Sequence, residues 1–139
     1  MRLERLLKRL NNNVRLKDYS LELDIKSISA NSKTLRKGSL FVAVEGTKSR
    51  GSDFVAEALR NGALCVVGSR LNAGVNFKQV PFIEVKDSRR ALAVLADEFF
   101  DHPSKKLKVI GVTGTNGKTT ITYLIRDILK QADFSSGII

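Results

Sequence analysis

The sequence is poor in the residues that build disulfides and metal clusters. It contains one cysteine, Cys65, and one histidine, His102, in 139 residues. A single cysteine cannot form an intrachain disulfide, and neither residue alone can make a cysteine or histidine metal cluster. Cys65 lies in the apolar run at 63–67. We expect it to be an inert core thiol, because a reactive thiolate needs an accessible, electropositive setting.

Long apolar runs are also missing. No stretch of the sequence approaches the roughly 18 uncharged apolar residues that a membrane-spanning helix needs. The first nine residues carry several charges, from Arg2 to Arg9, where a signal peptide would have an uninterrupted apolar segment. These two absences lead us to expect a cytoplasmic protein.

Acidic residues are in short supply, since 24 lysines and arginines face 14 aspartates and glutamates, for a net charge of +10. Such an excess suits either nucleic acid or a phosphate-rich small molecule. The basic residues are dispersed, with 18 of them in residues 1–104 and 6 in residues 105–139. Tryptophan is absent, only two tyrosines occur, and no RNA-binding aromatic motif is present. We therefore expect no nucleic-acid partner.

The apolar pattern alternates between strand-like and helix-like segments. It predicts strands at 23–28, 40–44, 64–67, 82–85 and 109–112. Helical spacing predicts a helix at 3–10, one that ends at Asn61, one that follows Asp87 or Ser88, and one after the glycine-rich turn. Alternation of this kind predicts an α/β fold with a largely parallel sheet.

The helix that ends at Asn61 carries more detailed expectations than the others. Ser52 or Asp53 can cap its first turn, and Gly62 can end it. Its inward face is predicted to consist of four apolar residues: Phe54, Val55, Ala58 and Leu59.

A domain boundary is predicted near residue 104. The segment 102–106 is polar and contains Pro103, which is typical of a linker. One strand, one loop and one helix cannot bury their own apolar faces, so residues 105–139 are too few for a domain. We expect a domain over 1–104, followed at 105–139 by the truncated start of a second one.

The strongest chemical motif is a glycine-rich loop between a predicted strand and a predicted helix. Gly114 and Gly117 let the backbone turn so that its N–H groups point at phosphate oxygens. Lys118 can reach the β- and γ-phosphates, and the hydroxyl of Thr119 can bind Mg²⁺. The common P-loop pattern has another glycine where this sequence has Val112.

The run from Thr113 to Thr120 resembles the ATP loop of the Mur ligases and their folylpolyglutamate and cyanophycin relatives. The resemblance implies ATP and Mg²⁺ as cofactors, Lys118 as a catalytic residue and Thr119 as a metal ligand. The ATP-binding residues that it implies are Gly114, Thr115, Asn116, Gly117, Lys118, Thr119 and Thr120.

The N-terminal half is similar to the substrate-binding domain of MurE and MurF enzymes. The likeness rests on 31–33 and 35–46 and continues in Gly51, Phe54, Ala58, Gly62 and Ala63. It implies binding of a UDP-N-acetylmuramoyl peptide through Ala30, Ser32, Thr47, Lys48 and Ser49. The sequence departs from the family pattern at Asn31, Lys33 and Arg50, where aspartate, arginine and aspartate are usual.

Three features favour the MurE type, namely Thr115, the tripeptide at 102–104 and the loop sequence as a whole. That type implies ATP-dependent addition of a diamino acid to UDP-N-acetylmuramoyl-L-alanyl-D-glutamate in peptidoglycan synthesis. The fragment itself is expected to bind ligands without catalysing, because the central and C-terminal domains lie beyond residue 139. The added amino acid, diaminopimelate or lysine, cannot be read from this part of the enzyme.

Two alternatives stay open from the sequence. One is a stand-alone nucleotide-binding or regulatory module. The other is a different Mur-like ligase, such as a MurF or a cyanophycin synthetase-like enzyme.

Overall fold

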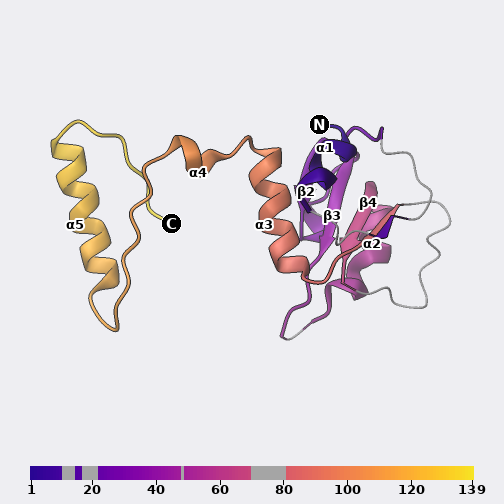
Figure 1. The fold of residues 1–139 in the computed structure, drawn as a ribbon. Helices are drawn as coiled ribbons and strands as arrows, with labels where there is room; N and C mark the ends of the chain where they lie inside the picture. The colour runs from indigo at the N-terminus through magenta and orange to yellow at the C-terminus, as the bar shows by residue number, and fades with distance from the viewer. Residues whose placement is uncertain (11–14, 17–21, 48, 70–80) are drawn as a thin grey trace. The chain divides into compact units, whose positions relative to one another are not determined.

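A computed structural model describes residues 1–10, 15–16, 22–47, 49–69 and 81–139, with only the backbone at 15–16. The described chain divides into two compact units, Met1–Pro103 and Ser104–Ile139 (Figure 1). Each unit is described by itself.

The first unit is built on a five-stranded sheet with the order β1-β5-β4-β3-β2. The strands are β1 (Arg15–Leu16), β2 (Ser27–Ser29), β3 (Ser39–Ala43), β4 (Ala63–Gly68) and β5 (Phe82–Glu84). Strands β2 to β5 pair in parallel, and β1 pairs antiparallel with β5. The predicted α/β fold with a largely parallel sheet is confirmed.

Helices cover both faces of this sheet. The α-helices of the first unit are α1 (Leu3–Leu7), α2 (Val55–Arg60) and α3 (Ser88–Phe99), and 3₁₀ turns lie at η1 (Lys8–Leu10), η2 (Ser32–Thr34) and η3 (Gly51–Phe54). Leu40 and Val42 face the core that contains α1 and α3, whereas Phe41 and Ala43 face the core that contains α2. Because successive strand residues point to opposite faces, a central strand between two cores is apolar throughout.

Two expectations for the first unit are wrong in part. The strand predicted at 23–28 is limited to β2, and before it Asp24 makes only an isolated bridge to Arg2. Phe54 was predicted to face inward but is 39% exposed. It lies at the end of a 3₁₀ turn that starts at Gly51, and neither Ser52 nor Asp53 caps α2. The altered turn changes the direction in which this side chain points.

A buried carboxylate ties the beginning of the first unit to its end. Glu98 on α3 forms ion pairs with Arg5 Nε at 2.9 Å and Arg9 Nε at 3.3 Å, and His102 Nε2 lies 3.3 Å from its Oε2. His102 Nδ1 also contacts Asp97 Oδ2 at 2.7 Å. A buried carboxylate needs such partners, because desolvation of an unpaired charge is costly.

The linker predicted at 102–106 contains a single helical turn, α4 (Pro103–Lys106). Pro103 occupies its first helical position, where the missing N–H group has no helical partner in any case. The polar composition led to the expectation of a linker, and the proline permits a short helix to begin there.

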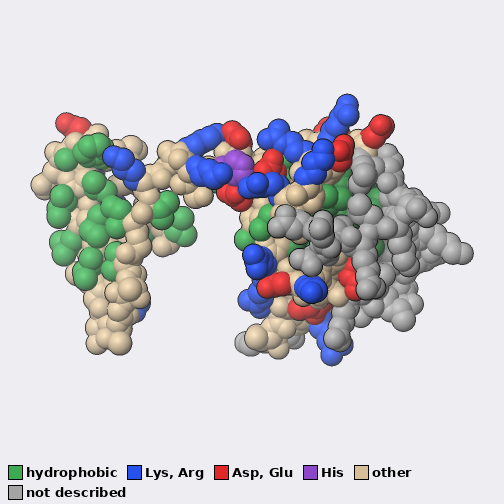
Figure 2. All heavy atoms as spheres, viewed as in Figure 1, with side chains coloured by type: hydrophobic (Ala, Val, Ile, Leu, Met, Phe, Trp, Pro, Cys, Tyr) green, Lys and Arg blue, Asp and Glu red, His purple; other side chains and the backbone are tan. Residues whose placement is uncertain are grey.

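The second unit contains α5 (Lys118–Gln131) and no β-strand. The strand predicted at 109–112 is therefore wrong, and Val109 and Ile110 are 75% and 59% exposed. A strand needs a hydrogen-bonded neighbour, and the unit offers none. The apolar face of α5, including Ile121, Leu124 and Ile128, is likewise exposed (Figure 2). Among the described residues, no helix has the length and apolar character required to cross a membrane.

Candidate functional site

The segments expected to hold the uridine diphosphate follow the carboxyl ends of two neighbouring strands. Ala30 and Ser32 come directly after β2, and the loop at 45–51 follows β3, to which β2 is paired in parallel. Ligands of open α/β sheets bind outside the carboxyl ends of their strands. The topology therefore brings both segments to the edge of the sheet where a ligand is expected.

Ser32 is 5% exposed, and its polar groups bind α2. Its hydroxyl donates to Glu57 Oε2 at 2.5 Å, and its carbonyl oxygen accepts from Asn61 Nδ2 at 2.9 Å. Asn31 caps the same turn, since its Oδ1 accepts from the backbone N–H of Lys33 at 3.0 Å. The hydroxyl proton of Ser32 is thus engaged, which leaves the oxygen as an acceptor for a ligand donor.

The other residues of the predicted uridine site lie mainly at the surface. Ala30, Thr47 and Ser49 are exposed, and Lys48 lies outside the described residues. The N–H of Gly46 donates to the carbonyl oxygen of Ser49 at 3.0 Å, which closes the loop on itself. This arrangement places backbone and side-chain polar groups in reach of solvent.

The sequence reasoning did not single out the residues that hold these segments. Glu57 and Asn61 bind Ser32, and Arg89 donates to the carbonyl oxygen of Glu45. Their positions on amphipathic helices identify them only as members of a polar face. Nothing in a single sequence indicates which polar side chain reaches a partner 25 or 44 residues away.

Cys65 is a free, buried cysteine in β4. Burial raises its pKa to about 12. The predicted place of this thiol in the core is confirmed, and a raised pKa disfavours the thiolate form at neutral pH.

The glycine-rich loop leads into the first turn of α5. Gly117 has φ +74° and ψ 0°, a left-handed conformation that glycine adopts without steric cost, and no side chain caps the helix. Lys118 Nζ donates to the carbonyl oxygens of Gly114 at 2.7 Å and Thr115 at 3.3 Å. The ammonium group of Lys118 therefore lies against the same loop that is expected to bind a phosphate.

The predicted ATP-loop residues from 114 to 120 are all exposed. This includes Thr119, the predicted Mg²⁺ ligand, whose hydroxyl is the kind of hard oxygen donor that Mg²⁺ accepts beside phosphate oxygens. In the part of the chain that the structure describes, no cluster of three or more histidine, cysteine, aspartate or glutamate residues could hold a metal.

Sequence comparison decides the family. The family described as "Mur ligase family, catalytic domain" matches residues 24–100, which is more than half of the chain. A second match, "Mur ligase middle domain", covers residues 112–139 and includes the glycine-rich loop. The chain belongs to the Mur ligase family.

Two relatives of this Mur ligase chain share one enzyme name. A UDP-N-acetylmuramoyl-L-alanyl-D-glutamate–2,6-diaminopimelate ligase from Clostridium tetani is 40% identical over 139 residues, which is 99% of this chain and 28% of the relative. The corresponding ligase from Aquifex aeolicus is 48% identical over 115 residues, which is 83% of this chain and 23% of the relative. The Mur ligase chain thus spans about a quarter of the length of these relatives.

Solved Mur ligase structures share the fold. The MurF ligase of Thermotoga maritima, crystallised with ADP, is 38% identical with a TM-score of 0.59 over 79% of this chain and 24% of that one. A MurF from Acinetobacter baumannii is 27% identical with a TM-score of 0.68 over 94% of this chain and 27% of that one. These likenesses agree with the family assignment and do not separate the MurE and MurF types.

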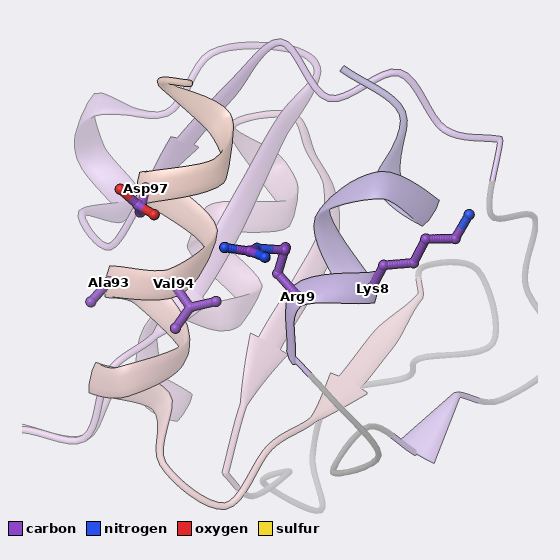
Figure 3. Close-up of a pocket in the computed structure, with 5 residues that line it drawn as sticks. All are labelled: Lys8, Arg9, Ala93, Val94 and Asp97. Atoms are coloured by element: carbon purple, nitrogen blue, oxygen red, sulfur yellow. The ribbon is translucent and has the colours of Figure 1, made fainter. Parts of the chain in front are cut away.

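A shallow hollow of the Mur ligase chain lies away from the predicted site. Lys8 and Arg9 line it from η1, and Ala93, Val94 and Asp97 line it from α3. Arg9 points toward α3, whereas Lys8 points away from it (Figure 3). None of the residues expected to bind uridine diphosphate or ATP lines this hollow. Two of its lining residues belong to the Glu98 cluster, since Arg9 pairs with Glu98 and Asp97 contacts His102.

Proposed function

We propose that this chain is the substrate-binding and ATP-loop part of a ligase of the MurE type. The whole enzyme adds a diamino acid to UDP-N-acetylmuramoyl-L-alanyl-D-glutamate, as the names of its relatives in Clostridium tetani and Aquifex aeolicus describe. The observation that carries the proposal is the arrangement of 30–32 and 45–51 at the carboxyl ends of two paired parallel strands.

In this proposal, residues 1–104 bind the UDP-N-acetylmuramoyl peptide. Ser32 accepts a hydrogen bond from a donor on the uridine, because its own proton is held by Glu57. Ala30 lies beside the base, and Thr47, Lys48 and Ser49 contact the nucleotide from the loop.

Residues 105–139 form the start of the central ATP-binding domain in this proposal. The backbone N–H groups at 114–117 and the open N-terminus of α5 suit the phosphates of ATP. Lys118 neutralises the β- and γ-phosphates, and Thr119 provides the protein hydroxyl for Mg²⁺. We expect the 139 residues alone to bind these ligands without making the amide bond, because a phosphate loop by itself gives Mg²⁺ one protein ligand, Thr119, and leaves the acyl phosphate open to water.

The uridine half of the proposal is tested by titration with UDP-N-acetylmuramoyl-L-alanyl-D-glutamate. We expect weak binding by calorimetry, with amide NMR shifts at 30–32 and in the 45–51 loop. Ser32→Ala should weaken binding by about tenfold, the value of one hydrogen bond to a ligand. Ser136→Ala, at an exposed serine of the second unit, is the matched control.

Because Ser32→Ala also removes the partner of Glu57, its folding is checked by urea denaturation before binding is compared. Amide shifts in the unaltered chain need no variant. Absence of shifts at both segments with saturating ligand would contradict the uridine site.

A further inference from the structure

The backbone N–H and C=O groups of Glu45 are both hydrogen-bonded to side chains of consecutive residues of α3. Its N–H donates to Ser88 Oγ at 3.4 Å. Its carbonyl oxygen accepts from Arg89 Nη2 at 3.2 Å and from Arg89 Nε at 3.3 Å. Ser88 is 4% exposed, so the hydroxyl that receives the N–H belongs to the core of the unit. The first turn of α3 is therefore hydrogen-bonded to the start of the loop that follows β3.

The far end of the same loop is fixed in another way. A Cβ atom at Gly51 would lie 2.4 Å from the backbone nitrogen of Val44 and 2.5 Å from the carbonyl carbon of Ala43. The returning chain thus packs directly on the end of β3, and Gly46 is bonded to Ser49 within the loop. In Figure 1 the loop extends past the end of the sheet beside the first turn of α3. Among these contacts, only the two hydrogen bonds from Arg89 are made by an exposed side chain.

We infer that Arg89 is a positioning residue for the 45–51 loop, and that it raises affinity for uridine diphosphate by holding this loop in its binding conformation before the ligand arrives. The inference rests on the proposed function for the identity of the ligand. A loop that is already ordered loses less conformational entropy on binding, so its anchor contributes to affinity without touching the ligand. Sequence resemblance assigned the loop to the nucleotide but gave no role to α3.

Direct contact of the Arg89 guanidinium with the diphosphate is the competing account. The two accounts differ in the free protein, where a positioning residue orders the loop and a phosphate ligand has no such effect. Arg90 provides a matched control, because it is the next arginine in α3. It is exposed, and it makes no side-chain hydrogen bond to the described residues of the loop.

The first measurement is amide hydrogen exchange of the full 139-residue chain by NMR, without ligand. In Arg89→Ala, exchange of the amides of Glu45 and Gly46 should be roughly threefold to tenfold faster, in line with loss of one or two exposed hydrogen bonds. Arg89→Lys should recover part of the protection, since lysine can donate to the carbonyl but lacks the two-nitrogen fork. Arg90→Ala should leave both amides unchanged. Unchanged exchange in Arg89→Ala would overturn the inference.

The second measurement is calorimetry of the same variants with uridine diphosphate. We expect Arg89→Ala to weaken binding by a factor similar to its effect on exchange, and Arg90→Ala to bind as the unaltered chain does. Weaker binding with unchanged exchange would instead establish direct phosphate contact. Failure of the unaltered chain to bind uridine diphosphate would count against the proposed function, whereas the exchange result would still decide whether Arg89 holds the loop.

Discussion

Two residues at the edge of the sheet, Ser32 and Gly51, show what a sequence motif can predict and what it cannot. The family pattern marked Ser32 and Gly51, and the structure gives each a distinct physical setting. Ser32 is tied to Glu57, which is 25 residues away, and Gly51 packs on the backbone of Ala43 and Val44. Neither contact could be predicted from the sequence, because the first depends on how η2 meets α2 in space and the second on how η3 meets the end of β3.

Gly51 is the residue at which a small change should matter most. In Gly51→Ala the added methyl would overlap backbone atoms of β3, which cannot rotate away as a side chain can. We expect the free energy of unfolding to fall by about 1–3 kcal/mol, as for other overpacked sites. Urea denaturation measures this change.

Gly137→Ala is the control for this substitution, because nothing lies within 4 Å of the position that a Cβ atom would take there. It should leave the unfolding midpoint nearly unchanged. Equal midpoints for the two variants would contradict the close approach at Gly51.

At the scale of elements, burial decided which predictions succeeded. Strands β3 and β4 were predicted because a strand between two cores is apolar along its length. The cap of α3 was also predicted, and Asp87 accepts from the N–H groups of Arg89 and Arg90. The strand predicted at 109–112 failed because its apolar residues have no neighbouring strand in the second unit. An apolar sequence favours a strand, but a strand forms only where a neighbouring strand hydrogen-bonds to it.

The N-terminus of α5 differs from that of α3, because no side chain occupies its first N–H groups. Such an end suits the phosphates of ATP, and Lys118 lies next to it, bonded to loop carbonyl oxygens. We expect Lys118→Ala to abolish the weak association of ATP, measured with a fluorescent ATP analogue. Lys130→Ala, at the other end of α5, should bind the analogue as the unaltered chain does. Equal loss in both variants would indicate a general charge effect instead of a site.

At the scale of the whole chain, the two units differ in what they bury. The first has apolar cores on both faces of its sheet, whereas α5 has no buried residue. Amphipathic spacing predicted α5 correctly. The exposure of its apolar face was expected too, because one strand, one loop and one helix cannot bury their own apolar faces.

This difference predicts uneven hydrogen exchange along the chain. Amides at 64–67 and 82–100 should be strongly protected, because they open only when the cores of the first unit are lost. Amides at 119–139 should exchange faster, since few packed contacts oppose their opening. Exchange monitored by mass spectrometry on peptides from both units measures this. Equal protection throughout would contradict the proposed boundary at residue 104.

The ion pairs of Glu98 have a mechanical consequence. The chain leaves the first unit through His102, which is joined by way of Glu98 to Arg5 and Arg9 near the N-terminus. A tensile force on the segment after His102 would therefore act on α1, η1 and α3 together. It would not detach α3 from the sheet one turn at a time. Parallel bonds that share a load resist tension better than bonds that break in sequence. The carboxylate thus joins both ends of the first unit at the residue where the chain leaves it.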